Sequence, residues 1–276
     1  MSSLYKFIAD PDVIQYILAG IVKFTPIPEL NDPSELVPHM NISEVESSLA
    51  RLRKVGYSED DMKHLRYQGN LLQRLAPKFL AINVPSTREE ANAVVRSPFY
   101  NKIDILEHLL SETAHEMSSK VGLFCLSQRY DSLPMWAHYA NNARGVAVEF
   151  KSLDSIFTGD NTGILNKPVP VRYEQDKKGV SFDPDSHESL FFVKFQDWSY
   201  EKEVRIVLPL AECDQDNLGI SKLYFKQLPK RCISRLILGW NIIPEKSAFI
   251  HEKVQAINPN VEIIQARIIR GQVELV

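Results

Sequence analysis

Helical and extended sequence patterns occupy separate parts of this chain, and this separation is the strongest constraint on its fold. Between residues 43 and 120, apolar residues recur three and four positions apart, as they do along one face of a helix. On both sides of this block, short runs rich in Val, Ile, Leu and aromatic residues end at turn-forming residues, which is typical of strands. We predict an α+β fold in which residues 1–276 form a single domain. A helical insertion or cap at 43–120 interrupts its split, mostly antiparallel sheet.

Local signals place several elements within this plan. Ser43 with Glu46, and Thr87 with Glu90, have the spacing of capping boxes at helix starts. A short helix is expected after Leu4–Ile8, with its first turn at Asp10-Pro11. Strands are predicted at Leu4–Ile8, Ile21–Phe24, Val121–Ser127, Gly145–Phe150, Val169–Tyr173, Val204–Leu208, Leu223–Phe225, Ile233–Leu238 and Val261–Ile269.

The segment 198–209, Trp-Ser-Tyr-Glu-Lys-Glu-Val-Arg-Ile-Val-Leu-Pro, offers the first candidate for chemistry. On an extended backbone Glu201, Glu203 and Arg205 share one face, which we expect to be wet. The guanidinium would then keep both carboxylates ionised. A carboxylate fixed at the start of a strand can bind a sugar hydroxyl or stabilise a cationic transition state. The alternative is a solvated edge strand with alternating charges.

A second candidate lies between two predicted strands in the middle of the chain. Trp136 and Tyr139 are three positions apart, so on a helix they share a face and can form an aromatic wall for a flat ring. The alternative is that both are core aromatics. His138 lies on a different side of that helix and is expected at the surface or behind the site.

Near the N-terminus, Lys6 alternates with Tyr5 and Phe7 on the first strand, where a lysine either snorkels to solvent or contacts a ribose hydroxyl or a phosphate. Asn31-Asp32 precedes a proline, which indicates either a plain turn or a polar loop bordering a ligand pocket.

Several function classes are disfavoured. The chain has only 11 glycines and contains no Gly-x-Gly-x-x-Gly, Walker-type loop or Gly-x-Ser-x-Gly elbow. His-Glu pairs occur without the second histidine of a zinc protease motif, and the three cysteines are far apart, so we expect no metal. A net charge of −3 gives no overall attraction to nucleic acid or to anionic lipid. Without a signal or spanning segment, we expect a soluble cytoplasmic protein.

In order and spacing, the motifs resemble a bacterial family, domain-of-unknown-function family 2971, over nearly the whole chain. The resemblance is weakest in 43–120. The motifs that carry it are Leu4-Tyr5-Lys6-Phe7, Asn31-Asp32-Pro33, Phe124-Cys125-Leu126-Ser127, Met135 to Ala140 with Gly145, and Trp198-x-Tyr200-Glu201-x-Glu203-Val204-Arg205.

A weaker resemblance links the chain to ADP-ribosyltransferases, which use a basic first-strand residue, an aromatic nicotinamide pocket and a glutamate that opens a late strand. Lys6 stands where that superfamily has His or Arg, Phe124 where it has Tyr, and Trp136 where it has a small hydroxyl residue. The resemblance implies an ADP-ribosyltransferase-like split sheet and NAD as substrate.

On this basis Glu203 would be catalytic and Glu201 would orient the acceptor or the ribose. Tyr139 and Phe124 would hold nicotinamide, and Lys6 would anchor ribose or pyrophosphate. The remaining candidate binding residues are Tyr5, Asn31, Asp32, Ser127, Trp136 and Arg205.

The expected function is ADP-ribosyl transfer from NAD to a protein or nucleic acid acceptor, or NAD hydrolysis, in a toxin or an anti-phage effector. Two alternatives are a non-enzymatic module that senses a nucleotide or a phage component, and a metal-independent nuclease in which Lys6, Glu203 and Arg205 converge on phosphate.

Overall fold

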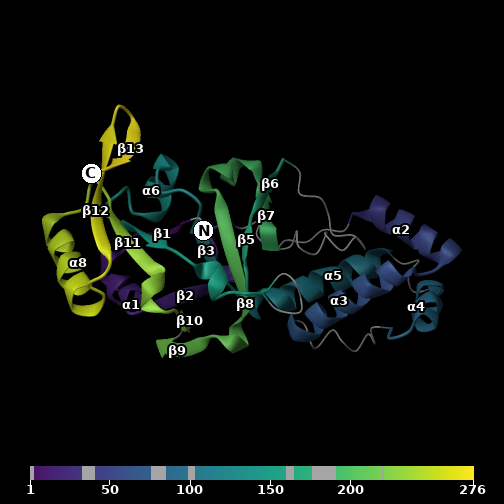
Figure 1. The fold of residues 1–276 in the computed structure, drawn as a ribbon. Helices are drawn as coiled ribbons and strands as arrows, with labels where there is room; N and C mark the ends of the chain where they lie inside the picture. Colours follow the sequence, from purple (N-terminus) through teal and green to yellow (C-terminus); the bar gives the residue numbers. More distant parts are fainter. Residues whose placement is uncertain are drawn as a thin grey trace.

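The fold is taken from a computed structural model that describes residues 3–32, 41–75, 85–98, 103–159, 165–175, 191–218 and 221–276. The described residues form an α+β architecture, as predicted from the sequence (Figure 1). Its helices are α1 (Ile14–Leu18), α2 (Ile42–Val55), α3 (Glu59–Leu75), α4 (Arg88–Val95), α5 (Ile103–Ser118), α6 (Leu133–Tyr139) and α8 (Pro244–Ile257). Among the described residues, none of these helices has both the length and the apolar composition needed to cross a membrane.

The strands are β1 (Leu4–Ile8), β2 (Ile21–Pro26), β3 (Val121–Ser127), β4 (Val146–Phe150), β5 (Pro168–Pro170), β6 (Arg172–Glu174), β7 (Val193–Phe195), β8 (Glu203–Pro209), β9 (Asp214–Leu218), β10 (Ser221–Gln227), β11 (Ile233–Leu238), β12 (Glu262–Ile269) and β13 (Gln272–Leu275). Short 3₁₀ turns include η1 (Pro11–Val13), η2 (Ile27–Glu29) and η6 (Gln196–Glu201).

The described strands form one eleven-stranded sheet and the separate pair β6–β7. The main path runs β13-β12-β11-β4-β1-β3-β2-β10-β9, and β8 pairs with both β3 and β5. All of these pairings are antiparallel except β11 with β12, so the prediction of a mostly antiparallel sheet is confirmed. The small pair β6–β7 is parallel.

The sheet opens between β1 and β3. The two strands pair only at Tyr5 and Ser127, and the other end of β3 pairs instead with β2, where Thr25 lies opposite Leu123. From Val121 to Ser127 the other edge of β3 pairs continuously with β8. Side chains from β1, β2, β3 and β8 can therefore converge on the opening.

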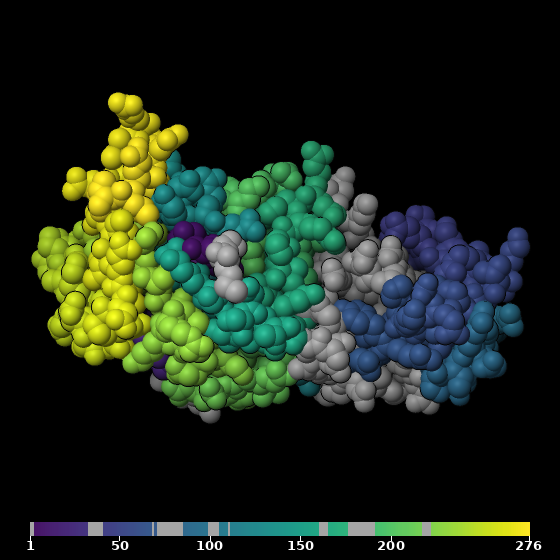
Figure 2. All heavy atoms as spheres, in the orientation of Figure 1, coloured from purple at the N-terminus to yellow at the C-terminus, as the bar shows by residue number. Residues whose placement is uncertain are grey.

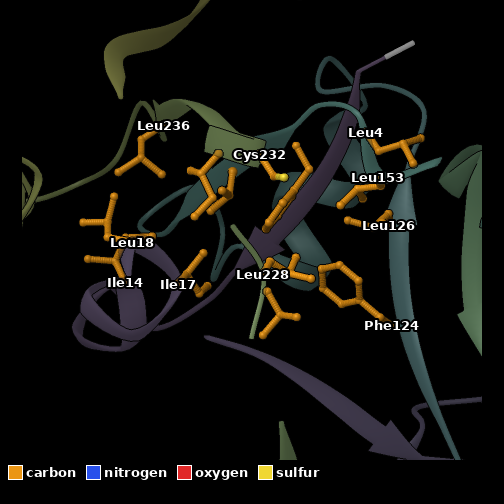
Figure 3. Close-up of a cluster of buried hydrophobic side chains, with 14 of the residues drawn as sticks. Leu4, Ile14, Ile17, Leu18, Phe124, Leu126, Leu153, Leu228, Cys232 and Leu236 are labelled. Carbon is orange, nitrogen blue, oxygen red and sulfur yellow. The ribbon is translucent and has the colours of Figure 1, made fainter. Parts of the chain in front are cut away.

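Helices cover both faces of the sheet, and the central strand β4 is therefore buried on both sides. Val146 and Val148 pack in the cluster that includes α1 and α8, whereas Ala147 packs in the cluster that includes α6. The first cluster is the larger and contains most of the side chains drawn in Figure 3. Because β4 is buried on both faces, it reads as a continuous apolar run rather than an alternating one.

Helices α2 to α5 lie at one end of the molecule, and the β12–β13 hairpin lies at the opposite end (Figures 1 and 2). Val45, Leu49, Leu52 and Val95 form a small core of their own within the block. The block is also anchored to the sheet, because Met117 at the end of α5 packs in a cluster with sheet residues.

Local expectations are mostly confirmed, with some corrections. The Thr87–Glu90 capping box is present, but the predicted Ser43–Glu46 box is wrong, because Asn41 caps α2 two residues earlier, through a bond from the Glu44 N–H. The predicted strand Val169–Tyr173 is interrupted at Val171, whose N–H bonds to the Glu203 carbonyl. The sequence patterns do not predict α8 or the strands β7, β9 and β13, which the structure shows.

Candidate active site

A cavity of about 230 Å³ lies at the opening between β1 and β3. Strands β1, β2, β3, β7 and β8 contribute to its wall, together with α6 and the segment around η2. Its lining residues are Tyr5, Lys6, Phe7, Thr25, Glu29, Leu30, Asn31, Cys125, Leu126, Ser127, Met135, Tyr139, Lys194, Glu201 and Glu203. Seven of the sequence candidates therefore share one cavity, although they come from distant parts of the chain: Tyr5, Lys6, Asn31, Ser127, Tyr139, Glu201 and Glu203.

Glu203, the first residue of β8, is a buried and fully paired carboxylate. The Nε and Nη2 atoms of Arg205 donate to its two oxygens, each at 2.9 Å, and Arg205 Nη1 donates to the Phe191 carbonyl at 2.7 Å. Burial alone would raise the pKa of Glu203, but the charges of Arg205 and Lys194 outweigh it and lower that pKa to about 2. The expectation that Arg205 keeps this carboxylate ionised therefore agrees with the structure.

The expectation of a wet face or a solvated edge strand is wrong. β8 lies between β3 and β5, and Glu201, Glu203 and Arg205 expose only 3%, 6% and 1% of their surface. Charged residues at this depth need partners, because desolvation of an unpaired charge costs several kcal/mol. Pairing, rather than solvation, therefore makes these charges tolerable.

Glu201 lines the cavity, but it does not lie on the strand that carries Glu203, where the sequence predicts it. It ends η6 rather than opening the strand, and Lys202 after it has a left-handed backbone with φ 45°. Its carboxylate accepts a short hydrogen bond from the Tyr139 hydroxyl and pairs with Lys194 at 2.8 Å. Burial and the neighbouring charge of Glu203 raise the pKa of Glu201, and the cation that pairs with this carboxylate is Lys194, whereas Arg205 pairs with Glu203.

Lys194 on β7 is a site residue that the sequence analysis missed. Its ammonium lies 2.8 Å from Glu201 and 3.3 Å from Glu203, and the side chain is only 3% exposed. It also lies over the Trp198 ring, 4.7 Å from the centroid. A lone lysine between Val193 and Phe195, shortly before two glutamates, is a signal that could have found it.

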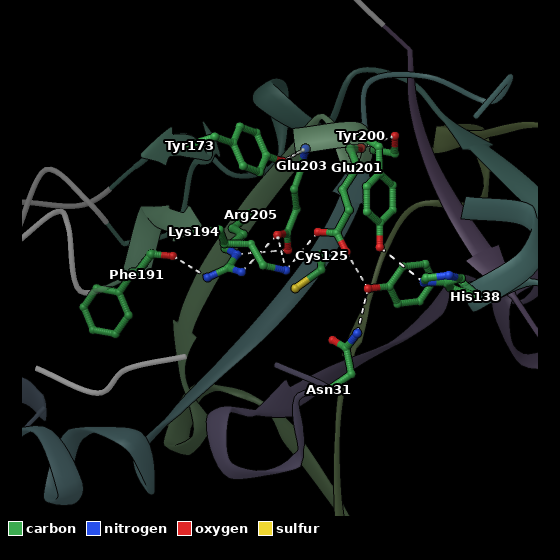
Figure 4. A network of polar contacts seen from close by, with 12 residues as sticks. Asn31, Cys125, His138, Tyr173, Phe191, Lys194, Tyr200, Glu201, Glu203 and Arg205 are labelled. Carbon is green, nitrogen blue, oxygen red and sulfur yellow. Dashed lines mark hydrogen bonds and ion pairs between the residues drawn. The ribbon is translucent and has the colours of Figure 1, made fainter. Parts of the chain in front are cut away.

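Tyr139 connects Glu201 to Asn31 in the loop after η2; Figure 4 labels these two partners. Its hydroxyl accepts a hydrogen bond from Asn31 Nδ2 at 2.7 Å and donates to Glu201. Burial and Glu201 both raise the pKa of Tyr139, so the phenol stays protonated and remains a donor. Ser127 Oγ holds the backbone of Glu201 in place by donating a hydrogen bond to the Glu201 carbonyl at 2.6 Å.

On the β1 side of the cavity, Lys6 Nζ donates to the Cys125 carbonyl at 3.0 Å and lies 5.7 Å from the centroid of the Phe124 ring. Neither of these groups carries a negative charge. Burial and Glu203 raise the pKa of the Cys125 thiol strongly, so the thiol is neutral and is a poor nucleophile. Tyr5 faces Glu149, with its hydroxyl 3.4 Å from Oε1.

Four sequence candidates lie behind the cavity wall rather than lining it. Phe124 and Trp136 are core side chains, 2% and 0% exposed, so neither can stack a ligand ring in the cavity. Trp136 instead donates from Nε1 to the Tyr130 carbonyl and packs on Phe7. Asp32 is buried outside the lining. Arg205 is engaged by Glu203, so the predicted convergence of Lys6, Glu203 and Arg205 on a phosphate does not form.

Within the described ranges, no three His, Cys, Asp or Glu side chains are grouped so that they could hold a metal. The two central carboxylates are matched by Lys194 and Arg205, so they do not form a bare anionic pocket.

Residues 135–206 match the model of a family described as "Protein of unknown function (DUF2971)". The matched segment runs from α6 into β8 and contains Tyr139, Lys194, Glu201 and Glu203. This match supports the resemblance to that family. Comparisons with curated proteins and with solved structures found no significant match.

Proposed function

We propose that this protein cleaves the bond between nicotinamide and ribose in NAD and transfers the ADP-ribosyl group to a macromolecule or to water. The observation that carries the proposal is a pair of buried glutamates, two residues apart at one cavity, whose pKa values are shifted in opposite directions. Such a separation of two carboxyl groups supplies one permanent anion and one proton acceptor.

In this mechanism each glutamate has its own task. Cleavage of the ribosyl C1′–N bond gives an oxocarbenium-like state, and nicotinamide leaves with the bonding electrons as a neutral pyridine. Glu203 is ionised over the whole physiological range and stabilises that positive charge. The acceptor O–H or N–H then attacks C1′, and Glu201 takes its proton. Lys6, whose contacts are a carbonyl and a ring, provides a cation for the ligand's pyrophosphate.

The test is nicotinamide release from NAD by the purified protein, with and without bacterial lysate as a source of acceptors. Glu203→Gln and Glu201→Gln should each lower the rate by roughly 10²–10³, the effect of removing one preorganised electrostatic partner. Glu149→Gln is the matched control, because Glu149 is equally buried but does not line the cavity. Absence of release under every condition would contradict the proposal.

A second candidate is a non-enzymatic nucleotide-binding module. One observation favours it: both oxygens of Glu203 accept hydrogen bonds from Arg205, as in a structural ion pair. This alternative predicts that NAD binds to the wild-type protein, is recovered intact, and binds equally well to Glu201→Gln.

A further inference from the structure

Four aromatic rings form a row beside the cavity. His138 and Tyr139 come from α6, and Trp198 and Tyr200 come from η6, which packs against α6. Neighbouring ring centroids are 6.3 Å apart for His138–Tyr139, 5.8 Å for His138–Tyr200 and 6.1 Å for Trp198–Tyr200. We call these four residues the aromatic row. Figure 4 shows His138 and Tyr200 on the far side of Glu201 from Arg205.

The aromatic row differs in its exposure from two ring pairs of the sheet core in the described part of the chain. Phe7 with Trp136, and Phe124 with Phe150, also pack ring against ring, but all four of these side chains are buried. In the aromatic row, His138 is exposed and the other three residues are half-buried. Contiguous aromatic surface that stays in contact with water is typical of a binding site, since its burial by a ligand is favourable.

The aromatic row continues the cavity. Tyr139 belongs to both, because its ring is part of the row while its hydroxyl holds Glu201. Lys194 makes a second connection, since it lines the cavity and lies over the Trp198 ring. A ligand that enters the cavity beside Glu201 can therefore extend onto the aromatic row without crossing unrelated surface.

The size of the cavity requires such an extension for a dinucleotide. At about 230 Å³ it is smaller than the roughly 300–1,000 Å³ typical of sites that enclose drug-sized ligands. It can hold one ribose with its attached ring, and the other nucleoside must lie outside. The row also offers polar atoms to such a group, because the Tyr200 hydroxyl and His138 Nδ1 lie 3.2 Å apart at the surface.

We propose that the aromatic row is a stacking subsite for a nucleobase, which holds the adenine of the dinucleotide while the cavity holds the nicotinamide ribosyl half. This inference rests on the proposed function for the identity of the ligand. A long nucleic acid strand fits the same rings less well, because strand binding relies on phosphate neutralisation by basic residues and this chain has a net charge of −3.

The experiment separates the two halves of the ligand. Binding of AMP and of nicotinamide mononucleotide is measured by calorimetry for the wild-type protein, Tyr200→Leu and Trp198→Leu. Loss of one base–aromatic stack should weaken AMP binding at least about fivefold, and binding of nicotinamide mononucleotide should stay within twofold. Tyr16→Leu is the matched control, because Tyr16 is 56% exposed on α1 and does not line the cavity.

Tyr200→Phe keeps the ring and guards against misfolding of the leucine variants. It keeps the stack and loses only the hydroxyl, so its AMP affinity should lie between that of the wild-type protein and that of Tyr200→Leu. Equal AMP affinity in the wild type and both leucine variants, or no AMP binding by the wild type, would overturn the subsite. Nicotinamide release from NAD is measured separately. If AMP binding depends on the aromatic row but no nicotinamide is released, the subsite is supported and the proposed function is contradicted. If nicotinamide is released and the KM for NAD is unchanged in both leucine variants, the proposed function is supported and the subsite is contradicted.

Discussion

The two halves of the site use the same residue type in opposite ways. In the ion-paired region, which consists of Glu203, Arg205 and the Phe191 carbonyl, every strong hydrogen-bonding group has a protein partner. In the cavity-facing region, which consists of Glu201, Tyr139 and Asn31, the carboxylate is held mainly by a neutral phenol and by Lys194, which it shares with Glu203. The ion-paired region resembles a structural ion pair, whereas the carboxyl group of the cavity-facing region can exchange a proton.

This difference teaches that burial alone does not decide what a buried carboxylate does. Glu201 and Glu203 are about equally buried, yet only Glu203 has a guanidinium on both of its oxygens. A charge-assisted, bidentate pair stabilises the ionised form strongly, whereas a phenol donor does so weakly. The partner therefore sets the protonation state, and the following predictions test that difference.

The largest effect is expected for Arg205→Met. It removes the guanidinium that compensates Glu203, so the free energy of unfolding should fall by about 3–5 kcal/mol. Urea unfolding at pH 7 measures this loss. Arg129→Met is the control, because Arg129 pairs with Asp131 at the surface and should lose at most about 1 kcal/mol. Similar losses in the two variants would show that the buried ion pair stabilises the fold no more than a surface ion pair does.

Glu203→Gln should give a loss that depends on pH. The pKa of Glu203 is lowered from 4.5 to about 2, so its ionised form stabilises the fold above pH 4.5, and this contribution is lost as the pH falls toward 2. We expect a deficit of about 3 kcal/mol at pH 7 relative to wild type, which shrinks across that window. Urea unfolding at pH 7, 4.5 and 3 checks this. A deficit that does not change with pH would assign it to packing instead of charge.

Tyr139→Phe should act on the cavity-facing region with a smaller effect on stability, about 1 kcal/mol for the lost hydrogen bond. Because the phenol's hydrogen bond lowers the pKa of Glu201, its removal should raise that pKa further. If Glu201 is the proton acceptor, the acidic limb of the pH–rate profile for nicotinamide release then moves to higher pH. Tyr224→Phe on β10 serves as the control. If the acidic limb of the pH–rate profile does not move and the rate of nicotinamide release is normal, Tyr139 has no role in the reaction.

The smallest effect on stability is expected for Glu201→Gln, at most about 1 kcal/mol at pH 7, because the glutamine oxygen can still accept the hydrogen bond from Tyr139. Burial and Glu203 raise the pKa of Glu201, so whatever stability this group contributes is present below pH 4.5 and is lost as the pH rises through its folded pKa. A neutral glutamine therefore removes little at neutral pH. Thermal unfolding at pH 5 and pH 8 measures the stability of Glu201→Gln relative to wild type. A loss as large as that of Glu203→Gln would contradict the difference proposed between the two regions.

Local sequence signals predicted the parts of the site that depend on neighbours in the chain. The pairing of Glu203 with Arg205 follows from their spacing of two on a strand, and the strand itself follows from its run of Val, Ile and Leu. The same reasoning failed at Glu201, because the left-handed Lys202 separates it from the strand. It also predicts a stacking wall of Trp136 and Tyr139, although the Trp136 ring is completely buried and the half-buried Trp198 lies next to the site.

By itself, the sequence determined the α+β class, most of the strands, the helical block and the ion pair on β8, because each depends on periodicity or on spacing within one element. Only the tertiary structure decided which residues meet at the cavity. Asn31, Tyr139, Lys194 and Glu201 come from four separate segments and meet where β1 and β3 part. The depth at which these charges are buried, and hence the direction in which each carboxyl pKa shifts, depends on strand order and helix packing, which no local pattern encodes.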